Sequence, residues 1–156
     1  MRKELMYHKP DAEKLKMAEE LIEQIANGEG DVAEALRKLE ELTGKRQEEA
    51  EFSEYWSYTD LDVIAEKTLV EEAPLVQDLT REELIEIVSV MSDAFFNDED
   101  GKLLFYEDLL YKSLSLPYAA DYIMQLVGTY EELADRMLSD AKNGNILFGH
   151  RNTSTR

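Results

Sequence analysis

Around Asp98 and Asp100, residues that can bind calcium are spaced much as they are in a calcium-binding loop. An EF-hand loop takes ligands from its positions 1, 3, 5 and 12 and has a glycine at position 6. With Gly101 at position 6, Asp98 and Asp100 fill positions 3 and 5. Glu107 fills position 12, but position 1 is Phe96, whose side chain cannot bind calcium. The pattern favours an acidic turn in which Gly101 takes a positive φ, so we predict no metal site, with weak calcium binding as an alternative.

Aromatic rings and carboxylates alternate between residues 48 and 62. Rings anchor protein interfaces and lie over cationic groups, while carboxylates steer a basic partner towards them. Sites that stack nucleic-acid bases on rings also carry cationic side chains, so these acidic surroundings exclude direct nucleic-acid binding. We therefore predict a site for a basic protein partner. Its residues are Glu48, Glu51, Glu54, Tyr55, Trp56, Tyr58, Asp60 and Asp62.

Two rings of this segment also suit a core. Phe52 and Trp56, each taken singly, are predicted to pack in the core rather than at an interface. For the segment as a whole, core and interface are equally supported by the sequence. The position of Trp56 therefore stays open at this point.

The formal net charge of -18 is concentrated in the middle of the chain. Between Gln47 and Asp108 there are 19 acidic and three basic side chains, whereas the sequence on either side is nearly balanced. Such a distribution bears on what a surface attracts rather than on the fold. A halophilic protein would spread its acids, but nine Lys and Arg residues precede Gln47. We predict that the acids of this stretch form one exposed surface that meets positive charge on a partner.

The residue types that usually catalyse reactions form no recognisable catalytic pattern in this sequence. The chain has no cysteine, and its two histidines, His8 and His150, lie near its ends. Spacing does not combine them with a nucleophile, and no glycine-rich phosphate loop is present. Nothing in the sequence indicates a buried pair of carboxylates with separated pKa values. We expect no enzymatic activity and no cofactor.

Helices must position these side chains, because apolar residues recur at helical spacing and alternating strand patterns are nearly absent. Thr80 with Glu83, and Thr129 with Glu132, form capping-box patterns that each begin a helix. The predicted helices span 11–26, 32–43, 61–69, 81–95, 102–114, 118–127 and 130–142, with a further short helix within 46–58. The helices 81–95 and 102–114 are largely apolar and are expected at the centre.

The length of 156 residues and the hydrophobic content of 44% indicate one globular domain. We predict an all-α fold, a single-domain bundle of about seven or eight short helices over residues 1–149. Within it, 1–44 is an N-terminal helical hairpin, 45–78 an acidic aromatic segment and 79–149 the core helices. Residues 150–156 are expected to be a disordered tail.

The sequence favours a cytoplasmic protein without a membrane partner. Residues 1–10 have no apolar h-region, so no secretory signal is expected. The longest apolar stretches, 84–91 and 103–111, are interrupted by polar residues and are too short to cross a bilayer. The negative charge opposes binding to anionic lipid, and the lack of cysteine fits a reducing compartment.

Four short segments carry a resemblance to a known group of proteins. They are Thr43-Gly44-Lys45, Phe52-Ser53-Glu54-Tyr55-Trp56-Ser57-Tyr58-Thr59-Asp60-Leu61, Asp78-Leu79-Thr80-Arg81-Glu82-Glu83-Leu84 and Glu131-Glu132-Leu133. Over much of its length the chain resembles small acidic helical immunity proteins of bacterial toxin–immunity pairs. The resemblance implies a bacterial, cytoplasmic protein that occludes a basic toxin domain. It assigns no toxin-contact residue.

Together these features predict a non-enzymatic acidic binding protein that neutralises a basic protein, as an immunity protein or antitoxin does. One alternative is a phage-type inhibitor that mimics nucleic acid and blocks a DNA-binding enzyme. Its carboxylates should follow phosphate-like spacing along an elongated surface, whereas occlusion of a toxin needs carboxylates clustered around aromatic rings. The other alternative is a helical module that binds calcium weakly. The sequence indicates neither the partner's identity nor the oligomeric state.

Overall fold

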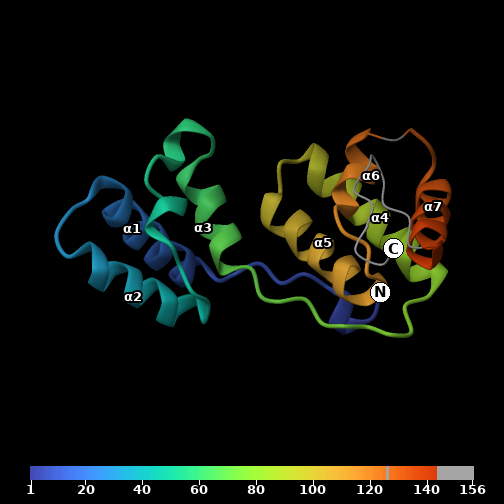
Figure 1. Cartoon of the computed structure of the whole chain (residues 1–156), viewed down its shortest axis with the longest axis horizontal. Coiled ribbons are helices and arrows are strands. Elements are labelled where there is room, and N and C mark those ends of the chain that lie inside the picture. The colour runs from blue at the N-terminus through green and yellow to red at the C-terminus, as the bar shows by residue number, and fades with distance from the viewer. Residues whose placement is uncertain (126, 144–156) are drawn as a thin grey trace, which may run out of the picture. The chain divides into compact units, whose positions relative to one another are not determined.

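The computed structural model of the chain describes residues 1–125 and 127–143. These residues form α-helices and short 3-10 helices (η) and include no strand, so the predicted all-α fold is confirmed (Figure 1). The elements are η1 Lys3–Leu5, α1 Ala12–Asn27, α2 Val32–Thr43, η2 Glu49–Glu51, η3 Tyr55–Ser57, α3 Leu61–Leu69, α4 Arg81–Phe96, α5 Asp100–Leu114, α6 Ala119–Gln125 and α7 Tyr130–Asn143. The tail predicted over 150–156 lies outside the described residues.

The chain forms two compact units. The hairpin unit is His8–Val70, and the core unit consists of Met1–Tyr7 and the chain from Glu71 onward. The segment predicted over 45–78 is therefore divided between them at Val70. That both units act as the one domain predicted over 1–149 stays a prediction.

Capping residues set the bounds of the first two helices. Where α1 begins, the carboxylate of Asp11 accepts a hydrogen bond from the backbone N–H of Lys14 at 2.8 Å. Asp31 accepts one from the N–H of Glu34 where α2 begins. Gly28 ends α1 with a φ of 64°, a left-handed conformation that glycine adopts without a Cβ clash. The short connection lets α1 pack against α2, and both pack against α3.

The three helices of the hairpin unit enclose one apolar core. Its buried side chains are Ala18, Ile22, Ile25, Ala35, Leu39, Phe52, Ile64, Ala65 and Leu69. Phe52 comes from the irregular segment between α2 and α3 and is only 1% exposed. The Phe52 ring thus anchors that segment to the helices, and its burial confirms the core position predicted for Phe52.

Helix α4 is the central helix of the core unit. It begins with the predicted capping box, in which Thr80 accepts from the N–H of Glu83 at 3.1 Å and Glu83 accepts from the N–H of Thr80 at 3.0 Å. Leu84, Ile87 and Met91 are fully buried, because α4 packs against α5, α6 and α7. The central place predicted for this apolar helix is confirmed.

The second predicted capping box is also formed. Thr129 and Glu132 exchange hydrogen bonds at 3.0 and 3.1 Å where α7 begins. The helix before it was predicted over 118–127, but α6 begins at Ala119. The reason is that Tyr118 has a φ of 57°, outside the right-handed helical region.

A buried carboxylate that sequence reasoning missed ties α6 to α7. Asp140 is 5% exposed and accepts a hydrogen bond from the hydroxyl of Tyr122 at 2.6 Å. Arg136 donates to the same carboxylate at 3.1 Å. Burial raises the pKa of the Tyr122 hydroxyl, and the hydrogen bond to Asp140 raises it further. The buried Asp140 carboxylate therefore has the hydrogen-bond partners that a buried polar group needs.

The N-terminal residues are tied to the start of α4. Arg2 donates from Nε and Nη2 to the two carboxylate oxygens of Glu83, at 2.6 and 2.9 Å. Its Nη1 donates to Asp78 at 3.0 Å. The hydrogen bonds from Arg2, and then that from the backbone of Thr80, lower the pKa of Glu83 from 4.5 to about 2.

This pKa predicts a pH dependence of stability. The folded pKa of Glu83 is depressed, so its contribution is present above about pH 4.5 and is lost as the pH falls towards about 2. We expect Glu83→Gln to melt at a lower temperature than the unaltered chain at neutral pH, with the gap shrinking through that window. Glutamine preserves the capping hydrogen bond, so the comparison isolates the charge. Glu82→Gln is the control, and a gap that is the same at pH 7 and near pH 2 would contradict the role given to Arg2.

Candidate protein-binding site

The short helix predicted within 46–58 is present as two separate 3-10 helices. They are η2 and η3, and local hydrogen bonds hold them. The hydroxyl of Tyr58 donates to the backbone oxygen of Glu51 at 2.8 Å, and this hydrogen bond connects η3 to η2. The hydroxyl of Ser57 donates to the backbone oxygen of Glu54 at 2.8 Å. Together with the buried Phe52, these bonds fix the backbone that carries the predicted site.

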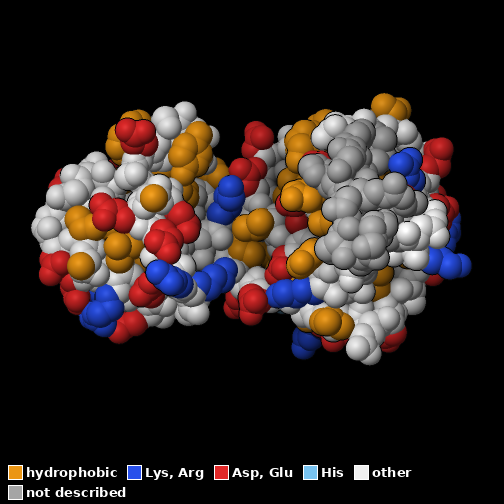
Figure 2. All heavy atoms as spheres, viewed as in Figure 1, with side chains coloured by type: hydrophobic (Ala, Val, Ile, Leu, Met, Phe, Trp, Pro, Cys, Tyr) orange, Lys and Arg blue, Asp and Glu red, His pale blue; other side chains and the backbone are white. Residues whose placement is uncertain are grey.

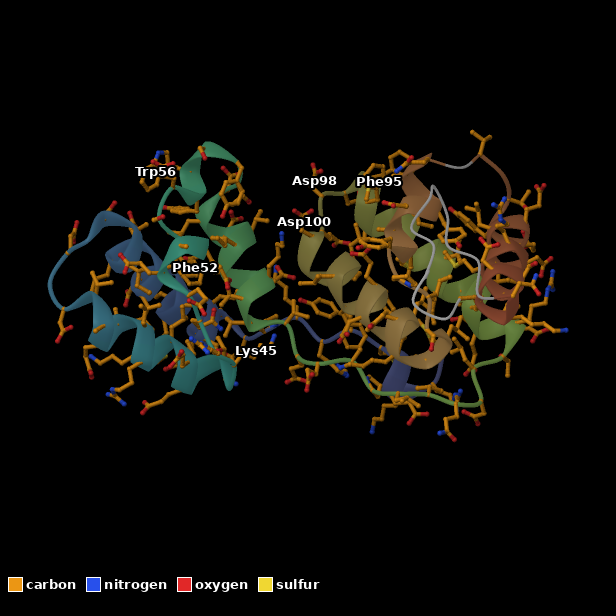
Figure 3. The ribbon with its side chains drawn as sticks, viewed as in Figure 1. Lys45, Phe52, Trp56, Phe95, Asp98 and Asp100 are labelled. Atoms are coloured by element: carbon orange, nitrogen blue, oxygen red, sulfur yellow. The ribbon has the colours of Figure 1, made fainter. Side chains whose placement is uncertain are left out.

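The exposed rings of this segment are Trp56 and Tyr58. Trp56 is 59% exposed and Tyr58 is 66% exposed. The core position predicted for Trp56 alone is therefore wrong: the buried Phe52 turns the following residues outward, and Figure 3 places Trp56 at the outer edge. Tyr55 is half-buried against the core and meets the Trp56 ring edge-on, with ring centroids 5.6 Å apart. We call residues 48–62 the aromatic–acidic face.

Most carboxylates of the aromatic–acidic face have no cationic neighbour. Glu48 pairs with Arg46 at 3.2 Å, and both side chains are well exposed. Within the described part of the chain, no ion pair is formed by Glu51, Glu54, Asp60 or Asp62. The space-filling view shows hydrophobic, acidic and basic side chains interspersed over the hairpin unit (Figure 2), but no basic side chain pairs with these four acids. Their negative charge is thus available to an external cation.

The acidic stretch predicted as one surface is divided. Its acids up to Glu66 belong to the hairpin unit and those from Glu71 onward to the core unit. In the core unit, cations pair with several of them, and most of these pairs, though not that of Lys112 with Asp108 inside α5, connect parts distant in sequence. The pairs include Arg2 with Asp78 and Glu83, and Lys112 with Glu72 and Asp108. Other acids of the core unit, such as Glu71, Glu82 and Asp93, form no ion pair among the described residues, so uncompensated acids of the predicted surface lie in both units.

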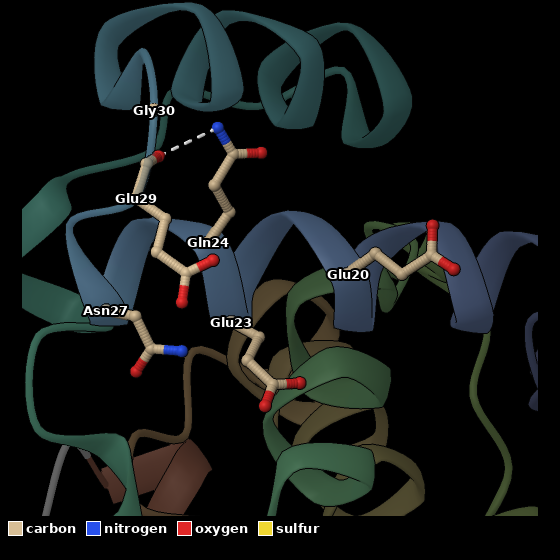
Figure 4. A pocket seen from close by; sticks show the side chains of 6 residues that line it. All are labelled: Glu20, Glu23, Gln24, Asn27, Glu29 and Gly30. Atoms are coloured by element: carbon tan, nitrogen blue, oxygen red, sulfur yellow. Dashed lines mark hydrogen bonds between the residues drawn. The ribbon is translucent and has the colours of Figure 1, made fainter.

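Sequence reasoning missed a group of acids in α1 and in the loop that follows it. Glu20, Glu23 and Glu29 line an open depression of 530 Å³ together with Gln24, Asn27 and Gly30 (Figure 4). Gln24 donates to the backbone oxygen of Glu29 at 3.0 Å, which holds the loop at its rim. Burial raises the pKa of Tyr55, and the charge of Glu23 raises it further, so Glu23 lies within electrostatic reach of the aromatic turn. The spacing of Glu20 and Glu23, three residues apart on a helix, was the available signal.

The acids with calcium-like spacing, Asp98 and Asp100, lie where helix α5 begins. Helix α5 begins at Asp100, and Gly101 is buried within its first turn, so the positive φ predicted for Gly101 is wrong. Asp98 takes that conformation instead, with a φ of 56°. Glu107 accepts a hydrogen bond from the N–H of Ala120 at 3.3 Å. Across 1–125 and 127–143, no group of three or more His, Cys, Asp or Glu side chains is arranged to hold a metal ion.

Comparison with known proteins leaves the site to be interpreted from its own geometry. No protein-family model matches the sequence, and no curated protein or solved structure is significantly similar to it. Among the described helices, none is both long and apolar enough to cross a membrane.

Phe52 and Trp56 differ in burial, so we expect their removal to affect stability to very different extents. We expect Phe52→Ala to lower the free energy of unfolding by about 3–5 kcal/mol, because it removes a fully buried ring. Trp56→Ala should change it by about 0.5 kcal/mol, because most of that ring is in solvent. Urea unfolding followed by circular dichroism measures both variants. Equal losses of unfolding free energy would contradict the placement of Phe52 in the core and Trp56 at the surface.

Proposed function

We propose that this chain is a non-enzymatic binding protein that neutralises a basic protein partner, in the manner of a bacterial immunity protein or antitoxin acting in the cytoplasm. One observation carries the proposal: Trp56 and Tyr58 are exposed on fixed turns among carboxylates that lack an ion-pair partner within the described residues. Aromatic residues that are rigid before binding make favourable anchors, because little side-chain freedom is lost when they are buried.

Occlusion is the mechanism that this arrangement supports. The rings would be buried against the partner, and Glu51, Glu54 and Asp60 would pair with lysines and arginines of its active surface. If the partner is a nuclease-like toxin, these are the residues that hold phosphates. Close charge pairs at protein interfaces couple by about 1.5–7 kcal/mol, enough to account for a tight complex from a few contacts.

The composition of this face supports occlusion over mimicry of nucleic acid. A mimic needs carboxylates in a row at phosphate-like spacing, whereas the unpaired acids here alternate along the chain with two exposed rings. The resemblance of residues 52–61 to immunity proteins points the same way. The calcium alternative has less support, because Asp98, Asp100 and Glu107 form no metal-holding group in the described structure.

Reversal of charge on the aromatic–acidic face tests the proposal. The partner to try is a basic protein encoded beside this chain's gene, co-expressed and then measured by stopped-flow association at low salt. We expect Glu51→Lys, Glu54→Lys and Asp60→Lys combined to slow association by about tenfold or more, because these charges steer the encounter. Helical content should be unchanged, since all three side chains are exposed.

The matched control changes the same number of exposed acids in the core unit. It combines Glu71→Lys, Glu82→Lys and Asp93→Lys and produces the same change in net charge. Association should be slowed much less by this control. If both triple variants slow association equally, net charge alone drives the encounter, and the assignment of a specific face fails.

A further inference from the structure

Two open depressions lie next to each other along α1, and we treat them as one groove. The acidic depression lined by Glu20, Glu23 and Glu29 shares Glu20 and Gln24 with a second depression of 460 Å³ between α1 and α2. The second depression has apolar side chains from both helices, Met17, Leu21 and Leu42, between polar edges. Together they form a groove that is apolar at one end and acidic at the other.

The apolar end exposes carbon surface that the hairpin unit does not cover. Met17 is 46% exposed, and Leu21 and Leu42 are only partly buried where they pack on the core. A methionine in such a place adapts to different apolar side chains, because its thioether chain is flexible and polarizable. This end can accept an apolar side chain from another molecule.

The acidic end lacks internal compensation. Glu20, Glu23 and Glu29 form no ion pair with any described residue, and all three are exposed. At the apolar end the edges differ: Glu41 is paired with Arg37, and Lys38 is exposed without an ion pair in the described structure. The groove is thus more negative towards the α1–α2 loop than towards Lys38, which gives a charged occupant one preferred direction.

We propose that this groove binds an amphipathic, basic segment of a protein partner, with an apolar side chain between Met17 and Leu42 and a lysine or arginine among Glu20, Glu23 and Glu29. The inference rests on the proposed function in one respect, that the partner is a basic protein. It adds a second contact with a defined shape, next to the aromatic–acidic face. Apolar anchoring with charged edges is how amphipathic helices bind grooves between two helices.

The test uses the whole chain and a synthetic probe, so it does not depend on the partner's identity. The probe is a capped peptide of leucine and lysine, with leucines spaced three and four residues apart so that they share one helical face. Its control has the same composition in scrambled order. Amide chemical shifts of the full chain, labelled with nitrogen-15, are followed at low salt. We expect the patterned peptide to shift amides over 17–30 and 38–42 and to bind about tenfold more tightly than the scrambled one.

Variants separate this groove from the aromatic–acidic face. Glu20→Gln, Glu23→Gln and Glu29→Gln combined should weaken peptide binding by about tenfold, the effect of three exposed charge pairs. Glu48→Gln, Glu51→Gln and Glu54→Gln combined remove the same charge elsewhere in the hairpin unit and should weaken it much less. Lys38→Glu should tighten binding, a gain that a misfolded variant cannot produce.

Other outcomes overturn the inference. Shifts spread over both units, or equal weakening by the two triple variants, would show non-specific attraction to an acidic protein. Shifts confined to 48–62 would move the peptide to the aromatic–acidic face, which rejects the groove but supports the proposed function. A free chain that sediments as a dimer and becomes monomeric with Met17→Asp would assign the groove to a second copy.

Discussion

Burial of Phe52 is the constraint on which the site depends. Its ring is 1% exposed in the core formed by α1, α2 and α3. Phe52 lies between η2 and η3, so its burial anchors both of these short helices to the core. Trp56, four residues later, lies at the surface. The hydrogen bond from the Tyr58 hydroxyl to the backbone oxygen of Glu51 then connects η3 to η2. An interface built on such turns loses little conformational freedom when it binds.

Among the described residues, ion pairs between distant parts of the chain are concentrated in the core unit. In the core unit, Arg2 pairs with Glu83, Arg81 with Asp135 and Lys112 with Glu72, all from distant parts of the chain, so part of the acidic excess stabilises the fold. In the hairpin unit, the acids around Trp56 and those of the α1 depression have no such partners among the described residues. Exposed like charges oppose a compact state, which makes a role in binding a better explanation for them than stability.

Local signals in the sequence were sufficient for much of the fold. Capping pairs such as Thr80 with Glu83 predicted helix starts correctly, because their chemistry lies within one turn. Effects that depend on tertiary contacts could not be predicted. The buried Asp140 is indistinguishable in sequence from an exposed acid, and its satisfaction depends on Tyr122 from another helix.

The candidate site was predictable in composition and not in geometry. The alternation of rings and acids identified residues 48–62, but only packing decides that Phe52 is buried and Trp56 exposed. The pairing of acids in the core unit depends on residues as far apart as Arg2 and Glu83, which no spacing rule connects. The groove on α1 required the second helix, because its apolar end is shared between α1 and α2.

Trp56 is the single tryptophan of the chain, so its fluorescence reports on the aromatic–acidic face without a label. In the free protein its emission should be that of a solvated indole, strongly quenched by acrylamide, because the side chain is 59% exposed. In the complex with a tryptophan-free basic partner, emission should shift to the blue and quenching should fall sharply. Emission and quenching that stay unchanged in a stoichiometric complex would show that the partner binds elsewhere and would contradict this account.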